Sequence, residues 1–228
     1  MGEIVLDRID QSKLRESVYA ALHAAFTRGA YAPADVLSLR SLAEQLGTSM
    51  TPVREAVRRL VAEGALVDTP SRTLQVPPFD TERLTDLMRA RIALEPMLTE
   101  LAVERMTGET EQSLASILQE GTLLGDQPDL EQNYRFHFTL YKESRSPVIL
   151  PVVEGLWLQY GPYLKLMIAR AGPAIGRGND IHAEILDAVR QRDGRAAAAA
   201  VTKDILRSFA LVEDGKLHLG EALDPTGS

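Results

Sequence analysis

The sequence predicts a mainly helical protein, with a small N-terminal domain that contains a short β-hairpin and an all-α antiparallel bundle of about six helices. Three observations support this fold class. Residues 38–64 hold two short amphipathic runs on either side of a tight turn. Short β-prone runs are confined to residues 66–76, and apolar residues recur at helical spacing almost throughout from residue 80.

The first predicted helix covers residues 11–28. Leu14, Val18 and Leu22 recur there at helical spacing, and Gly29 ends the pattern. Residues 31–35 form the connecting turn to the next helix.

Residues 38–64 are predicted to form a helix-turn-helix. Leu39, Leu42 and Leu46 share one face of the first helix, and apolar residues from Val53 to Val61 share one face of the second. Gly47 can adopt the left-handed conformation that closes the first helix. Ser49 or Thr51 suits the N-cap of the second helix, and Pro52 suits its first turn.

The polar face of this second helix is suited to DNA. Residues 66–67 and 73–76 read as a β-hairpin, which makes the domain a winged helix-turn-helix. Small hydroxyls and arginines at the start of a recognition helix match phosphate oxygens and major-groove base edges. The alternative is a helical hairpin whose arginines are merely solvated. The predicted DNA-binding residues are Arg40, Ser49, Met50, Thr51, Arg54, Arg58 and Arg72.

Composition narrows the class of protein. The 228 residues carry a net charge of −7, but residues 1–76 hold equal numbers of basic and acidic residues. DNA affinity would therefore come from locally placed arginines and from doubling in a homodimer. Cysteine is absent, which excludes a thiolate metal site. The chain shows neither a signal peptide nor an apolar run of about 20 residues, so we expect a cytoplasmic protein without membrane contact.

The remaining chain is predicted to be helical. Residues 77–79 form a proline-containing linker between a DNA-binding domain at 1–76 and a helical domain at 80–215, and residues 216–228 form a flexible tail. Six helices are expected, at residues 80–106, 110–124, 128–144, 147–170, 175–192 and 194–213.

Both halves resemble a known family. The run from Leu39 to Leu66, with its T-P-V-R-E-A core, is similar to the GntR family of bacterial transcription regulators, although Met50 stands where that family usually has Arg. The helical half resembles the effector-binding and dimerisation FCD domain of the FadR subfamily. The motifs that carry this resemblance are Arg91-x-x-Leu94-Glu95, Asn133-x-x-Phe136-His137 and His182-x-x-Ile185-Leu186.

The resemblance implies a divalent-metal site. The family pattern there is Asp, His, His and His, and this sequence has Asn133, His137, His182 and Asp204 at those positions. Asn133 and His137 lie four residues apart on one helix face, and a helical hairpin can bring His182 near Asp204. Two imidazoles and one carboxylate suit zinc, nickel or manganese. The alternative is a pair of core histidines that are hydrogen-bonded to Asn133 and Asp204.

The resemblance also places Arg91 at the wall of an effector pocket. Its planar guanidinium is suited to hold a carboxylate with two hydrogen bonds, whereas the alternative is an Arg91–Glu95 pair on a solvated helix face. A metal and an arginine together suit a small organic acid or sugar acid. The predicted effector-binding residues are Arg91, Tyr134, Arg170 and Asn179.

These observations favour a transcription regulator that binds operator double-stranded DNA as a homodimer under the control of a small carboxylate effector. The family resemblance implies that it is a repressor. Two alternatives stay open. One is a metal-dependent helical enzyme with an accessory winged domain, which lacks an evident general base. The other is a metal-free regulator in which Arg91 alone anchors the carboxylate.

Overall fold

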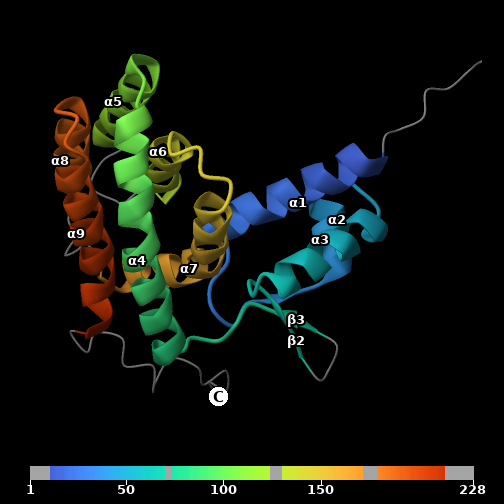
Figure 1. Cartoon of the computed structure of the whole chain (residues 1–228). Helices are drawn as coiled ribbons and strands as arrows, with labels where there is room; N and C mark the ends of the chain where they lie inside the picture. Colours follow the sequence, from blue (N-terminus) through green and yellow to red (C-terminus); the bar gives the residue numbers. More distant parts are fainter. Residues whose placement is uncertain (1–10, 70–72, 124–129, 172–178, 214–228) are drawn as a thin grey trace, which may run out of the picture.

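A computed structural model describes residues 11–69, 73–123, 130–171 and 179–213. Within these residues the chain forms a winged helix-turn-helix followed by six long helices, which confirms the predicted fold class. In Figure 1, α1, α2, α3 and the strands lie on one side, and the six helices stand together on the other.

The N-terminal part combines three helices with a small sheet. Its helices are α1 (Gln11–Thr27), α2 (Leu39–Gln45) and α3 (Met50–Ala62). Its strands are β1 (Val36–Leu37), β2 (Val67–Asp68) and β3 (Leu74–Gln75), ordered β1-β3-β2 and all antiparallel. The hairpin of β2 and β3 was predicted, but β1 was not. Two residues are too few to show alternation, and only pairing with β3 defines them as a strand.

Local sequence signals explain the helix-turn-helix. The Ser38 hydroxyl accepts a hydrogen bond from the Ser41 backbone N–H at 3.1 Å and caps α2. Gly47 has a φ of 62°, the left-handed conformation expected of the residue that ends this helix. Ser49 occupies the N-cap of α3 as predicted, but its side chain makes no capping hydrogen bond.

The C-terminal part contains the six expected helices. They are α4 (Thr81–Arg105), α5 (Gly108–Leu123), α6 (Leu130–Lys142), α7 (Ile149–Ala171), α8 (Asn179–Arg190) and α9 (Gly194–Glu213). Asp80 caps α4 by accepting hydrogen bonds from the backbone N–H groups of Glu82 and Arg83. Helix α4 packs along α9 and α7, as Figure 1 shows. No helix in the described ranges is both long enough and apolar enough to span a bilayer.

Helix α7 joins the two parts. Leu158 is fully buried in the hydrophobic core of the winged domain, whereas its neighbour Trp157 belongs to the core of the helical bundle. Gly161 packs so closely against the end of α1 that a Cβ there would overlap the carbonyl oxygen of Phe26. Arg83 donates hydrogen bonds to the Gln159 side chain at 2.6 Å and to the Gly64 carbonyl at 2.8 Å. One face of α7 therefore contacts the winged domain.

Candidate metal and effector site, and candidate DNA interface

Three side chains from three different helices meet inside the bundle. His137 on α6 has its Nε2 atom 3.1 Å from Asp204 Oδ2 on α9 and 3.2 Å from His182 Nε2 on α8. The remaining separation, from His182 Nε2 to Asp204 Oδ2, is 4.0 Å. All three residues are buried. These are three of the four predicted metal ligands, and the structure brings them together.

The donor set fits a divalent cation. Ligand atoms about 2.1 Å from a tetrahedral ion lie about 3.4 Å from one another, close to the separations of this group. Two imidazoles and one carboxylate form a familiar set for zinc. The fourth predicted ligand, Asn133, lies one turn before His137 on α6 and is half-buried.

Electrostatics keep His182 and Asp204 in the forms that bind cations. Burial, together with the neighbouring His137, lowers the pKa of His182 to about 3, so its imidazole is neutral at pH 7. Burial by itself would raise the pKa of Asp204. The hydrogen bond and charge of His137, with further charge from His182 and Arg207, outweigh that effect and lower it. Arg207 also donates a hydrogen bond to Asp204 Oδ1 at 3.0 Å.

Beside this group lies a buried carboxylate, Glu95. Arg91 donates to its two oxygens at 2.5 and 3.2 Å, Tyr141 donates through its hydroxyl at 2.7 Å, and Trp157 donates through its indole N–H at 2.9 Å. The Tyr141 hydroxyl is also 3.1 Å from His137 Nδ1. A continuous chain of hydrogen bonds therefore runs from Arg91 to the His137 ring.

The surroundings of Arg91 contradict the alternative of a solvated ion pair. The Arg91–Glu95 pair exists, but Arg91 is only 2% exposed, so this pair is buried. Arg91 was expected to donate two hydrogen bonds to an effector carboxylate, and in the structure it donates them to Glu95. Only Nη1 of Arg91 remains without a hydrogen-bond partner among the described residues. The guanidinium lies over the Tyr160 ring at 4.2 Å and the Trp157 ring at 4.5 Å.

The other predicted effector-binding residues are only partly described. Tyr134 on α6 is half-buried and stacks on Phe138 with 4.4 Å between ring centroids. Its ring also meets Trp157 edge-on at 6.0 Å, so Tyr134 borders the same aromatic cluster as Arg91. The side chains of Arg170 and Asn179 lie outside the described part of the chain.

Four residues were assigned no role in this site from the sequence: Glu95, Tyr141, Trp157 and Arg207. Three of them carried a local signal. Glu95 and Tyr141 lie four residues after Arg91 and His137, and Arg207 lies three after Asp204, so each shares a helix face with a predicted site residue. Trp157 lies in the bundle core, and its indole N–H also donates a hydrogen bond to Glu95.

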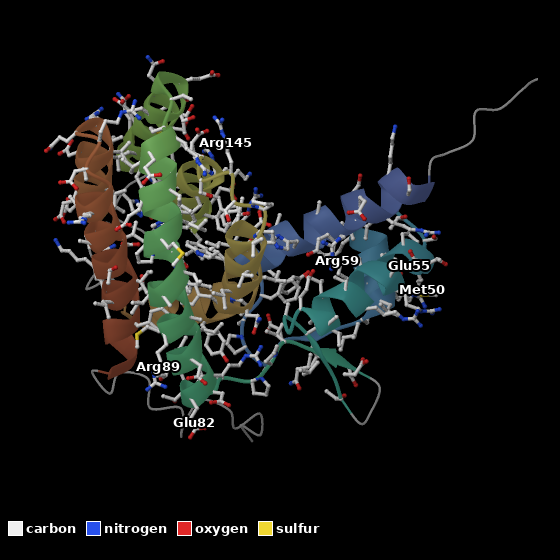
Figure 2. All side chains as sticks on the ribbon, in the orientation of Figure 1. Met50, Glu55, Arg59, Glu82, Arg89 and Arg145 are labelled. Atoms are coloured by element: carbon white, nitrogen blue, oxygen red, sulfur yellow. The ribbon has the colours of Figure 1, made fainter. Side chains whose placement is uncertain are left out.

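The predicted DNA-binding residues lie on an open surface. The exposed members of the set are Arg40, Ser49, Met50, Thr51, Arg54 and Arg58, and Arg72 lies outside the described residues. Figure 2 shows Met50 at the end of the molecule remote from α8 and α9. Arg54 and Arg58 line a hollow of about 460 Å³ between α3 and the small sheet.

Not every arginine of α3 is available to a partner. Arg59 forms an ion pair with Glu63 at 3.0 Å and lies over the Tyr19 ring at 3.6 Å, on the side of α3 that faces α1. Arg54 and Arg58 make no ion pair with any described residue. Because the apolar face of α3 is buried, these two arginines point outward with the exposed hydroxyls.

Comparison with known proteins finds two family matches in this chain. Residues 14–74 match the model of the bacterial regulatory proteins of the gntR family, and residues 86–207 match the FCD domain. The transcriptional regulator McbR of Escherichia coli is 36% identical over 150 residues, which cover 64% of this chain and 68% of McbR. The E. coli regulator YieP is 29% identical over 211 residues, which cover 79% and 87% of the two chains.

Solved structures of other proteins share the fold of this chain. The structure of E. coli McbR/YncC superposes with a TM-score of 0.80 at 29% identity, covering 89% of this chain and 98% of the other. A GntR regulator from Rhodococcus sp. RHA1 has the same fold, with a TM-score of 0.70 at 18% identity over 88% of this chain and 98% of the other. These relatives are named as transcription regulators, so the chain is a DNA-binding regulator and not an enzyme. It belongs to the GntR family, in the FadR-like subfamily whose helical half is an FCD domain.

Proposed function

We propose that this regulator binds its operator as a homodimer and that a small carboxylate, held at a divalent metal inside the FCD domain, releases it from the DNA. The observation that carries this proposal is the meeting of His137, His182 and Asp204 in the bundle interior. The protein would then act as a repressor relieved by its effector.

The exposed half of α3 supports the DNA-binding part. Arg54 and Arg58 lie one turn apart and are not tied to acidic neighbours in the described structure, so both are available for phosphates or guanine edges. The winged domain carries no net charge, and two copies on one operator would supply the affinity that a single neutral domain lacks.

The small net charge of the site favours a metal ion as the group that attracts an anionic effector. Arg91 neutralises Glu95, and Arg207 partly neutralises Asp204, so the described site carries little net charge of its own. A bound divalent ion supplies the positive charge that attracts an anionic effector. His137, His182 and Asp204 would hold it, with the Asn133 amide oxygen as a fourth donor.

An acidic effector is favoured by a second observation. The Nη1 atom of Arg91 is buried without a hydrogen-bond partner among the described residues, and an orphaned charged donor of this kind favours an oxygen acceptor. One carboxylate oxygen would lie at the metal and another oxygen at Nη1. Tyr134, Arg170 and Asn179 would border the same ligand.

Helix α7 offers a physical link from this site to the DNA. Trp157 and Tyr160 contact Arg91 or Glu95, whereas Leu158 and Gly161 contact the winged domain. An effector that favours a different position of α7 would therefore change how the two winged domains sit on an operator.

The DNA-binding part is tested by a gel shift with the promoter next to the protein's own gene. Arg54→Ala should weaken binding by about 5- to 150-fold per half-site, the range for a lost arginine contact to guanine. Arg89→Ala removes an exposed arginine from α4 and should leave affinity unchanged. Absence of any sequence-selective shift under all conditions would reject the proposal.

The sensing part is tested by metal analysis of protein purified without chelator, followed by titration of the operator complex with small mono- and dicarboxylic acids. His137→Ala should lose the metal and the response to acids. Equal metal content in the wild type and His137→Ala would reject the metal site. A response that survives metal removal would favour the metal-free sensor instead.

A further inference from the structure

Tyr141 links the predicted metal ligand His137 to the buried carboxylate Glu95. Its hydroxyl is 2.7 Å from Glu95 Oε2 and 3.1 Å from His137 Nδ1. All three side chains are fully buried, so these contacts are shielded from bulk solvent. Tyr141 and His137 lie four residues apart on α6, and Glu95 approaches from α4.

Proton counting assigns the direction of these hydrogen bonds. A tyrosine hydroxyl has one proton to donate, and an ionised carboxylate can only accept. Glu95 forms an ion pair with Arg91 through two hydrogen bonds, and it lies nearer to the Tyr141 hydroxyl than the imidazole does. The proton of Tyr141 therefore goes to Glu95, and His137 Nδ1 must carry a proton and donate it to the Tyr141 oxygen.

We infer that Tyr141, held by Glu95, is a positioning residue that keeps a proton on His137 Nδ1, so that Nε2 is the nitrogen that coordinates when a metal replaces its hydrogen bond to Asp204. The inference rests on the metal site proposed above. Nε2 is the atom that faces Asp204 and His182, so the tautomer set by Tyr141 is the one that coordination requires.

The second imidazole lacks such support. His182 Nδ1 is buried and has no hydrogen-bond partner among the described residues. Stacking on Phe136, at 4.5 Å between ring centroids, orients the His182 ring but selects no tautomer. Of the two histidines, His137 is therefore the one whose orientation and proton position are set in advance.

Glu95 can serve this purpose because it is itself held rigidly. Arg91 and Trp157 donate three further hydrogen bonds to its two oxygens. Arg91, which the family resemblance places at the wall of the effector pocket, thus also supports the metal ligand His137 through Glu95 and Tyr141. Removing the Tyr141 hydroxyl breaks only its hydrogen bonds to Glu95 and His137 and keeps the aromatic ring.

The test compares zinc affinity of the wild type, Tyr141→Phe and Tyr19→Phe, measured by competition with a chromophoric chelator. Loss of an outer-shell partner typically weakens metal binding about 10- to 100-fold, and this is expected for Tyr141→Phe. Tyr19 is the matched control, because its hydroxyl also donates to a carboxylate, Glu63, at 2.7 Å, but in the winged domain. Tyr19→Phe should bind zinc like the wild type.

A second measurement needs no variant. In ¹H–¹⁵N spectra of the zinc-loaded wild type, His137 should show a slowly exchanging proton on Nδ1 and coordination through Nε2. Coordination through Nδ1 would overturn the inference, as would wild-type zinc affinity in Tyr141→Phe while His137→Ala loses zinc. If His137→Ala keeps its zinc, the failure is that of the proposed metal site instead.

Discussion

At the scale of single residues, Glu95 is a buried charge of the helical domain whose loss should be costly. It is 0% exposed and neutralises a buried arginine, so Glu95→Gln would leave the Arg91 charge uncompensated. We expect a loss of about 3–5 kcal/mol in the free energy of unfolding, measured by urea denaturation.

Asp86→Asn is the control for Glu95→Gln. Asp86 also pairs with an arginine on α4, Arg89, but both side chains are more than 70% exposed. Loss of an exposed pair should cost less than about 1 kcal/mol. Similar costs for the two variants would contradict the view that burial makes the Glu95 pair critical.

His23 makes stability depend on pH. Burial lowers the pKa of His23, and the nearby Glu63 does not compensate. Because the folded pKa lies below the unfolded one, the unfolded state binds the proton first as pH falls. Stability should therefore decrease as pH falls through the usual histidine pKa of about 6.5 and below.

The His23 contribution can be isolated by measuring the unfolding free energy of the wild type and His23→Gln at pH 7.5 and 5.5. The wild type should lose more stability than the variant between these two values. An equal loss would show that other groups cause the whole dependence.

At the scale of secondary-structure elements, two serines at helix N-caps should behave differently. The Ser38 hydroxyl caps α2, so Ser38→Ala should cost about 1 kcal/mol of stability. Ser49 occupies the N-cap of α3 without a capping hydrogen bond, so Ser49→Ala should change stability by a few tenths of a kcal/mol at most. Thermal unfolding measures both effects.

The same pair of variants also tests the DNA-facing role of α3. If the Ser49 hydroxyl contacts phosphate, as proposed, Ser49→Ala weakens operator binding while leaving stability nearly unchanged. A large loss of stability in Ser49→Ala would indicate instead that the hydroxyl supports the helix.

At the scale of the whole molecule, the contact between α1 and α7 joins the DNA-binding and helical parts. A Cβ at Gly161 would overlap the Phe26 carbonyl oxygen and approach Thr27 Cα at 3.1 Å. Both obstacles belong to the backbone, which cannot rotate away. Gly161→Ala should therefore destabilise the protein by about 1–3 kcal/mol and change its operator affinity.

Gly155, on the same helix, provides the comparison. A Cβ there meets no atom within 4 Å, so Gly155→Ala should gain up to about 1 kcal/mol from helix propensity. Denaturation of the two variants, with a gel shift for each, separates the effect of helix propensity from the effect of the clash at the α1–α7 contact. A stabilising Gly161→Ala would show that α1 and α7 are not tightly packed.

Much of this molecule follows from short-range sequence patterns. The spacing of Val53, Val57 and Leu60 predicted the buried face of α3, and Gly47 marked the end of the helix before it. The four-residue spacing of Asn133 and His137 likewise predicted that they share one helix face. Each of these features depends on residues within about two helical turns, where backbone geometry alone sets which side chains lie together.

Tertiary packing alone decided the rest. Strand β1 exists only because β3 pairs with it, and Leu158 belongs to the winged domain only because α7 packs against α1. The guanidinium of Arg91 is buried against Trp157 and Tyr160 because α7 packs along α4, although the i,i+4 spacing of Arg91 and Glu95 by itself was compatible with a solvated pair. Such contacts join residues tens of positions apart, and local periodicity carries no information about which helices become neighbours.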